Sequence, residues 1–122
     1  MRSHTLLLVI SFFAVFSCDE DPVTTCSVKN PVEDLAWLAA EIQVMEESGM
    51  SHTLYVTQAK YGFMTVFLFR NCCPSCLSLI PVYNCSGDRI GNIGTGEGDI
   101  NPGILDYDAV IWKPDNSICN FN

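Results

Sequence analysis

The sequence predicts an α+β fold in which one N-terminal helix packs on a four- to five-stranded antiparallel sheet. Apolar residues first recur at intervals of three and four, and the period then drops to two. Short clusters of turn residues separate the later segments. Residues 30–122 are expected to form one domain, because a chain of this length can bury one modest core and not two.

The helix is predicted between Asn30 and Gly49. Asn30 suits the cap position, Pro31 suits the first helical position, and Glu33 lies three residues after the cap. Gly49 provides a stop signal. The apolar residues that share one face are Leu35, Leu38, Ile42 and Met45.

The first predicted hairpin follows the helix. Residues 53–60 and 63–70 are rich in β-branched and aromatic side chains, and Tyr61 and Gly62 separate them. Two such runs around a short glycine-containing turn are typical of antiparallel strands.

A second hairpin and a last strand complete the predicted sheet. Residues 77–84 and 89–93 flank a tight turn, and a short final strand is predicted at residues 109–112. Pro81 cannot donate to a strand ladder, so its strand is predicted at a sheet edge or at a bulge. The intervening residues 94–103 are rich in glycine and are predicted to form a loop.

The N-terminal segment predicts export. Residues 6–16 are an apolar run, too short for a membrane span of about 20 residues but suited to the centre of a signal peptide. Ser17 precedes Cys18, a small residue before a cysteine, which is the pattern cleaved in bacterial lipoproteins. Residues 1–17 are therefore predicted as a lipoprotein signal peptide, with lipid on Cys18 as the membrane attachment.

Two other interpretations of this segment are plain secretion, with Val15 and Ser17 as the small residues, and an uncleaved anchor. The cysteine count favours lipidation, because seven cysteines leave one unpaired in an exported protein. Residues 18–29 are polar and acidic and are predicted to form a tether. The expected location is the cell envelope, as an outer-membrane lipoprotein on the periplasmic side or the surface.

The charge excludes one class of partner. Removal of residues 1–17 takes away Arg2 and no acidic residue, so the formal net charge changes from −8 to −9. Phosphate backbones and anionic membrane surfaces repel such a domain, and no nucleic-acid partner is expected.

The six remaining cysteines are expected to form three disulfides, one of which fastens the tether or the C-terminal tail through Cys26 or Cys119. Cys76 and Cys85 are nine residues apart, roughly 30 Å if extended, whereas a disulfide joins Cα atoms about 4.4 to 6.8 Å apart. A direct bond between them requires a bend at Pro81; otherwise Cys85 pairs with another segment. The disulfide candidates are Cys26, Cys72, Cys73, Cys76, Cys85 and Cys119.

Residues 30–112 carry a set of motifs: an NPVEDLAWL helix opening, a TVFLF strand, a VYNCSGDRI hairpin, a GTGEGD loop and a VIWK strand. Together they resemble a family of small Bacteroidota lipoproteins catalogued as a domain of unknown function. The resemblance implies a fold unit and a location, and it transfers no catalytic residue. Family cysteines fall near Gly91 and Asn101, whereas Cys76, Cys85 and Cys119 lie elsewhere in this chain, so it transfers no disulfide pairing either.

Cys73 and Cys76 enclose a Cys-Pro-Ser-Cys motif, the spacing that thiol oxidoreductases use for a redox pair. The segment after it contains Pro81 and reads as a strand, so it does not provide the helix N-terminus that would stabilise a thiolate. Structural disulfides are the preferred interpretation. A zinc site would use Cys72, Cys73, Cys76 and Cys85, but exported thiols are usually oxidised.

Two further candidates are weak. Glu97, Asp99 and Asn101 in the glycine-rich loop offer oxygen atoms to calcium, but their spacing differs from known calcium loops. His52 reads as a solvated turn residue and not as a catalytic base. We therefore expect no catalytic residue, no metal and no cofactor.

Two function classes follow from these observations. The first is a non-catalytic envelope lipoprotein that binds another envelope or extracellular protein or ligand, because a sheet with an exposed edge suits strand addition or loop insertion. The second is a structural or accessory subunit of an envelope assembly. A thiol redox protein that uses Cys73 and Cys76 is a third alternative.

Overall fold

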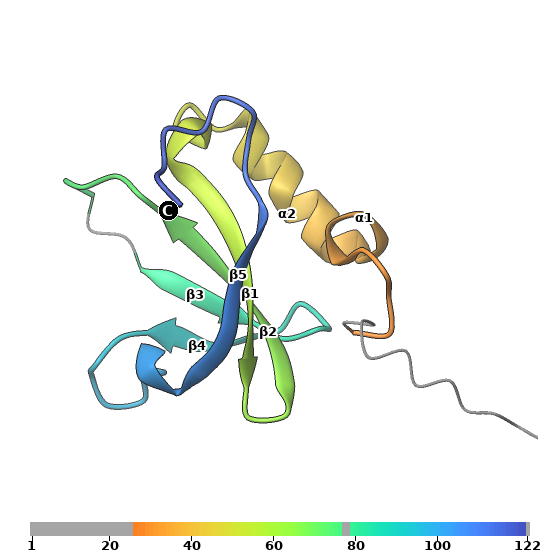
Figure 1. Cartoon of the computed structure of the whole chain (residues 1–122), viewed down its shortest axis with the longest axis vertical. Coiled ribbons are helices and arrows are strands. Elements are labelled where there is room, and N and C mark those ends of the chain that lie inside the picture. Colours follow the sequence, from red (N-terminus) through yellow and green to blue (C-terminus); the bar gives the residue numbers. More distant parts are fainter. Residues whose placement is uncertain (1–25, 77–78, 122) are drawn as a thin grey trace, which may run out of the picture.

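The computed structural model describes residues 26–76 and 79–121, and it confirms the predicted α+β architecture (Figure 1). The predicted signal peptide, Cys18 and most of the predicted tether lie outside the described residues.

The predicted single helix is wrong in one respect, because it is broken into α1 (Pro31–Asp34) and α2 (Ala36–Glu47). Leu35 between them is extended, with φ −88° and ψ 106°. The cap also differs from the prediction: the Asn30 side chain makes no capping hydrogen bond, and the Asn30 backbone N–H donates to the Asp34 carboxylate at 2.9 Å. Leu35 packs against the core despite the break, so the apolar face is preserved.

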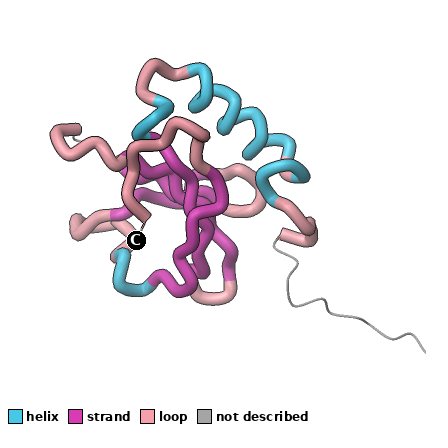
Figure 2. The backbone as a smooth tube through the Cα atoms, turned by 45° about the horizontal axis from the view of Figure 1, so that its top comes forward, coloured by secondary structure: helices cyan, strands magenta, loops and turns pink. Residues whose placement is uncertain are grey.

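The predicted apolar face of α2 covers one side of the sheet. Leu38 and Ile42 are buried against Val56 and Phe67. Figure 2 shows the helix running along the outside of the strands. This contact forms one of two core clusters.

The sheet has five strands in the order β4-β3-β2-β1-β5, and all neighbours are antiparallel. The strands are β1 (Leu54–Tyr61), β2 (Met64–Asn71), β3 (Ile80–Tyr83), β4 (Arg89–Ile93) and β5 (Leu105–Trp112). A short 3-10 helix, Ser51–Thr53, precedes β1, and another, Pro102–Ile104, precedes β5. β5 is twice as long as predicted, because Leu105 and Asp106 already pair with Tyr61 and Lys60.

The sheet is curled around the second core cluster. The pairing of β5 with β1 shifts register twice, and Tyr107 adopts a positive φ of 57° at one of these bulges. Bulges increase local twist and bend a strand. On the other side, Ile100 bridges to Ile93 at the end of β4. The residues buried inside the curl are Ala59, Val66, Leu68, Val82 and Ile100.

Pro81 does not place β3 at an edge, because β3 lies between β2 and β4. The alternative prediction, a bulge, matches the register shift between Val82 and Tyr83 in the pairing with β4. The pairing of β3 with β2 comprises only Phe67 with Tyr83 and Leu68 with Val82. It stops one residue from Pro81, whose nitrogen carries no hydrogen to donate.

Candidate functional site

The six cysteines of the described chain form three disulfides, as predicted. Cys26 pairs with Cys85, Cys72 with Cys119, and Cys73 with Cys76, at Cα separations of 5.5, 5.7 and 5.3 Å. Both the N-terminal segment and the C-terminal tail are fastened to the sheet. Three disulfides indicate an oxidising, extracytoplasmic compartment.

The N-terminal disulfide belongs to a compact structure at the β3–β4 turn. The Trp37 indole N–H donates to the Cys85 carbonyl at 2.8 Å. Gly87 lies against the Trp37 ring, where an added Cβ would approach within 2.8 Å, and it has a φ of +83°. The turn, the helix and the first described residues are thus held together.

The Cys-Pro-Ser-Cys segment forms a short loop after β2. The backbone N–H of Cys73 donates to the Asn71 side chain at 2.9 Å, and the N–H of Cys76 donates to the Cys73 carbonyl at 3.3 Å. Cys72 and Cys85 have their own disulfide partners, so the four-cysteine zinc set is replaced by three separate bonds. Among the described residues, no group of three or more His, Cys, Asp or Glu side chains is arranged to hold a metal ion.

The glycine-rich loop uses two of its three predicted calcium ligands, Asp99 and Asn101, for internal hydrogen bonds. The Asp99 carboxylate accepts a hydrogen bond from the Gly96 backbone N–H at 3.0 Å. Asn101 likewise accepts from the Gly103 N–H at 2.8 Å. These bonds shape the loop. At the other predicted site, the His52 carbonyl accepts from the Ile118 N–H at 2.9 Å and so helps to fasten the tail.

A surface groove of about 320 Å³ lies where β3 leaves β2. β2 continues to Asn71 and stays paired with β1 there, but its pairing with β3 ends at Leu68. The C-terminal half of α2 forms the other wall. The groove, called here the β2–β3 groove, is lined by Glu41, Met45, Leu54, Phe69, Arg70, Asn71, Leu79, Pro81 and Tyr83.

The β2–β3 groove is lined mainly by apolar and aromatic side chains, and Glu41 is the acidic residue among its described lining residues. The Phe69 and Tyr83 rings meet at 5.0 Å in an edge-to-face arrangement. Leu79 at the mouth is 72% exposed. Glu41 is exposed and has no hydrogen bond or ion pair to another described residue.

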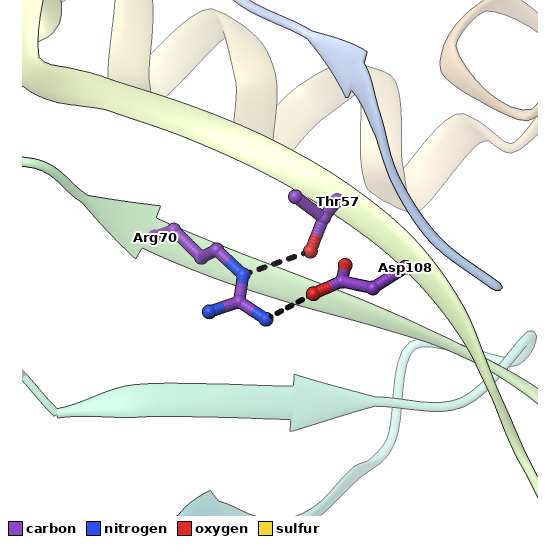
Figure 3. Close-up of polar contacts among 3 residues, drawn as sticks. All are labelled: Thr57, Arg70 and Asp108. Carbon is purple, nitrogen blue, oxygen red and sulfur yellow. Dashed lines mark hydrogen bonds and ion pairs between the residues drawn. The ribbon is translucent and has the colours of Figure 1, made fainter. Parts of the chain in front are cut away.

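Arg70 also lines the groove, but its guanidinium is paired with Thr57 and Asp108. The Arg70 guanidinium donates to two side chains (Figure 3). Its Nε donates to Thr57 Oγ1 at 3.0 Å, and its Nη2 donates to Asp108 Oδ2 at 2.6 Å. Thr57 and Arg70 share the face of the sheet opposite to Phe69, because side chains alternate along a strand. The Glu41 carboxylate therefore remains available to a partner.

Sequence reasoning missed this groove. Pro81 was the available signal, since it marks the point where the ladder to β2 stops. The wall formed by Glu41 and Met45 depends on how α2 lies across the sheet, and no local pattern encodes that position.

Comparison with protein-family models, with curated proteins and with solved structures found no match to this chain. The similarity to the Bacteroidota lipoprotein family therefore remains a prediction. Within the described part of the chain, no helix has the length and apolar character needed to cross a membrane.

Proposed function

We propose that this chain is an exported lipoprotein, anchored at Cys18, that acts as a non-catalytic binding module. Its ligand is an extended segment of another envelope or extracellular protein, and the binding site is the β2–β3 groove. The disulfides support the export step, because such bonds persist in oxidising compartments.

The observation that carries this proposal is the interrupted pairing of β2. From Phe69 to Asn71 the strand has β1 on one side and lacks β3 on the other. A strand that ends beside an apolar hollow can receive an extended peptide through main-chain hydrogen bonds, with pockets for its side chains.

The lining defines the chemistry of the segment that fits. Met45, Leu79 and Pro81 provide apolar contact, and Phe69 and Tyr83 provide aromatic surface. A lysine or arginine side chain has an apolar stem and a charged end. We infer that such a side chain lies along these residues and pairs with Glu41. The net charge, −8 for the whole chain and −9 without residues 1–17, favours approach of a basic segment.

A pull-down from native membranes tests the proposal. The bait is the full-length protein, and the test variants are Leu79→Asp and Glu41→Lys, both at exposed positions of the groove. Glu33→Lys in α1 is the matched control, since it makes the same change of charge at an exposed residue outside the groove lining. We expect the two groove variants to lose a partner that the wild type and the control retain.

The same experiment separates the binding module from an accessory subunit. A binding module forms a reversible complex that dilution or salt removes, because an exposed ion pair is screened. An accessory subunit co-purifies at a fixed ratio and is insensitive to the groove variants. That second result would overturn the proposed function.

A further inference from the structure

The β1–β2 turn projects an aromatic side chain into solvent. Tyr61 pairs with Met64, so the connecting loop has only two residues, Gly62 and Phe63. Gly62 has a φ of +62°, as the first central residue of a type II′ turn requires. The Phe63 side chain is fully exposed, with a relative exposure of 107%.

Three other apolar side chains are exposed at the same end of the sheet. Tyr61 pairs with both Met64 and Leu105, and Lys60 pairs with Asp106, so the start of β5 lies beside the turn. The exposed residues form what we call the apolar tip: Phe63, Met64 at 43%, Ile104 at 50% and Tyr107 at 87%. A grouped apolar surface of this kind marks a contact with a protein or a membrane.

The N-terminal segment joins the domain at this same end. Tyr83 pairs with Phe67, which is four residues, or about 13 Å of strand, from Phe63. The chain runs on toward that end to Cys85, which is bonded to Cys26. In Figure 1 the first described residues, in orange, lie beside the β3–β4 turn.

Covalent geometry limits how far this end can lie from the predicted lipid. Cys18 and Cys26 are eight residues apart, and eight residues span at most about 29 Å in any conformation. Lipid on Cys18 therefore holds the end that carries Cys26 close to the bilayer. The apolar tip shares that end.

We propose that the apolar tip enters the interfacial region of the bilayer as a second membrane contact beside the lipid. This inference rests on the proposed lipid anchor. Phenylalanine and methionine gain free energy on leaving water, and tyrosine suits the boundary because its ring is apolar and its hydroxyl polar. The acidic domain favours zwitterionic headgroups over anionic ones.

The contact also gives the domain an orientation. The β2–β3 groove lies at the opposite end of the sheet, where β1 begins and β2 ends. With the apolar tip on the bilayer, the groove faces away from the membrane toward a partner.

The test uses the lipidated full-length protein in phosphatidylcholine vesicles, with and without brominated acyl chains. Phe63→Trp adds an indole at the tip without disturbing the fold, because the position is fully exposed. The wild type, with Trp37 and Trp112, gives the background. Leu79→Trp is the control, an exposed position at the opposite end.

We expect the emission added by Phe63→Trp to shift to the blue and to lose most of its intensity in brominated vesicles. The emission added by Leu79→Trp should be unaffected. Equal quenching of both, or of neither, on a protein whose intact mass includes the lipid would overturn the membrane contact and leave the binding function standing. An intact mass without lipid on Cys18 would overturn the anchor and this inference together.

Discussion

The two ends of the sheet are built differently. At one end, β1 and β2 join through a two-residue turn, and Trp37, Gly87 and Cys85 pack closely around the β3–β4 turn. At the other end, the ladder between β2 and β3 is incomplete. Two disulfides, Cys72–Cys119 and Cys73–Cys76, join the segments there.

This difference bears on the proposed binding function. A complete ladder would bring β3 against Phe69 and leave no groove there. At the end that carries the groove, Cys72–Cys119 fastens the tail to the end of β2, while the pairing of β2 with β3 stops at Leu68. At the end that carries the β1–β2 turn, the Cys26–Cys85 disulfide fastens the first described residues to the sheet.

The largest effect is expected from removing the Cys26–Cys85 disulfide. Cys26 and Cys85 are 59 residues apart, and closing a loop of this length restricts the unfolded chain enough to contribute about 4 kcal/mol. The double substitution Cys26→Ser and Cys85→Ser should lower the free energy of unfolding by that amount in a denaturant titration.

The matched control is Cys73→Ser with Cys76→Ser, which opens a loop of sequence separation 3 and should cost only about 2 kcal/mol. This pair should also unfold with the wild-type denaturant slope. An equal loss of unfolding free energy in the two double variants would contradict a larger stabilisation by Cys26–Cys85 than by Cys73–Cys76.

A sharper test of the packing around the β3–β4 turn is Gly87→Ala. The new Cβ would lie 2.8 Å from the Trp37 ring at a φ of +83°, so strain and overpacking together should cost about 3 kcal/mol. Gly98→Ala is the control, because Gly98 has the same φ but no atom of the described residues lies within 4 Å of the added Cβ. Equal thermal shifts for the two variants would show that the Trp37 contact contributes nothing.

A smaller effect is expected where β2 and β5 are joined across β1. Arg70→Met leaves the buried Thr57 hydroxyl without its partner and should cost about 2 kcal/mol. Asp108→Asn alters only a partly exposed ion pair and should cost less than about 1 kcal/mol. Urea unfolding of both variants gives the ranking, and the reverse order would assign the main role to the ion pair.

The smallest change in stability is expected in the groove. Glu41→Lys changes an exposed side chain that has no partner among the described residues, and it should alter the free energy of unfolding by no more than about 0.5 kcal/mol. A hydrogen-bonded charge contributes about 1.5 to 3 kcal/mol, so the variant should bind the partner about tenfold or more weakly. Titration of the purified partner into wild type and Glu41→Lys measures this, and unchanged affinity would remove Glu41 from the site.

Periodicity predicted the parts of the fold that are locally encoded. Leu38 and Ile42 lie on the face that meets the sheet, and both hairpins form where turn residues separate β-branched runs. The early start of β5 was missed, because Asp106 and Asp108 lie on an exposed, bulged edge that lacks alternation. Charges and bulges on an edge strand also discourage pairing with other chains.

Disulfide pairing was predicted only in part. The length of an extended strand argued that Cys85 pairs with another segment unless Pro81 bends the chain, and its partner is Cys26. The choice between Cys26 and Cys119 depends on where the two termini meet the sheet. That is set by tertiary packing, as in the contact between Trp37 and the Cys85 carbonyl.

We propose that the two ends of the sheet face different partners, and a photo-crosslinking measurement tests this directly. A benzophenone side chain is placed at position 63 or at position 79 of the protein in the membranes of cells that export it. We predict lipid adducts from position 63, and from position 79 one protein adduct that Glu41→Lys abolishes and Glu33→Lys retains. Protein adducts from position 63 together with lipid adducts from position 79 would contradict the account.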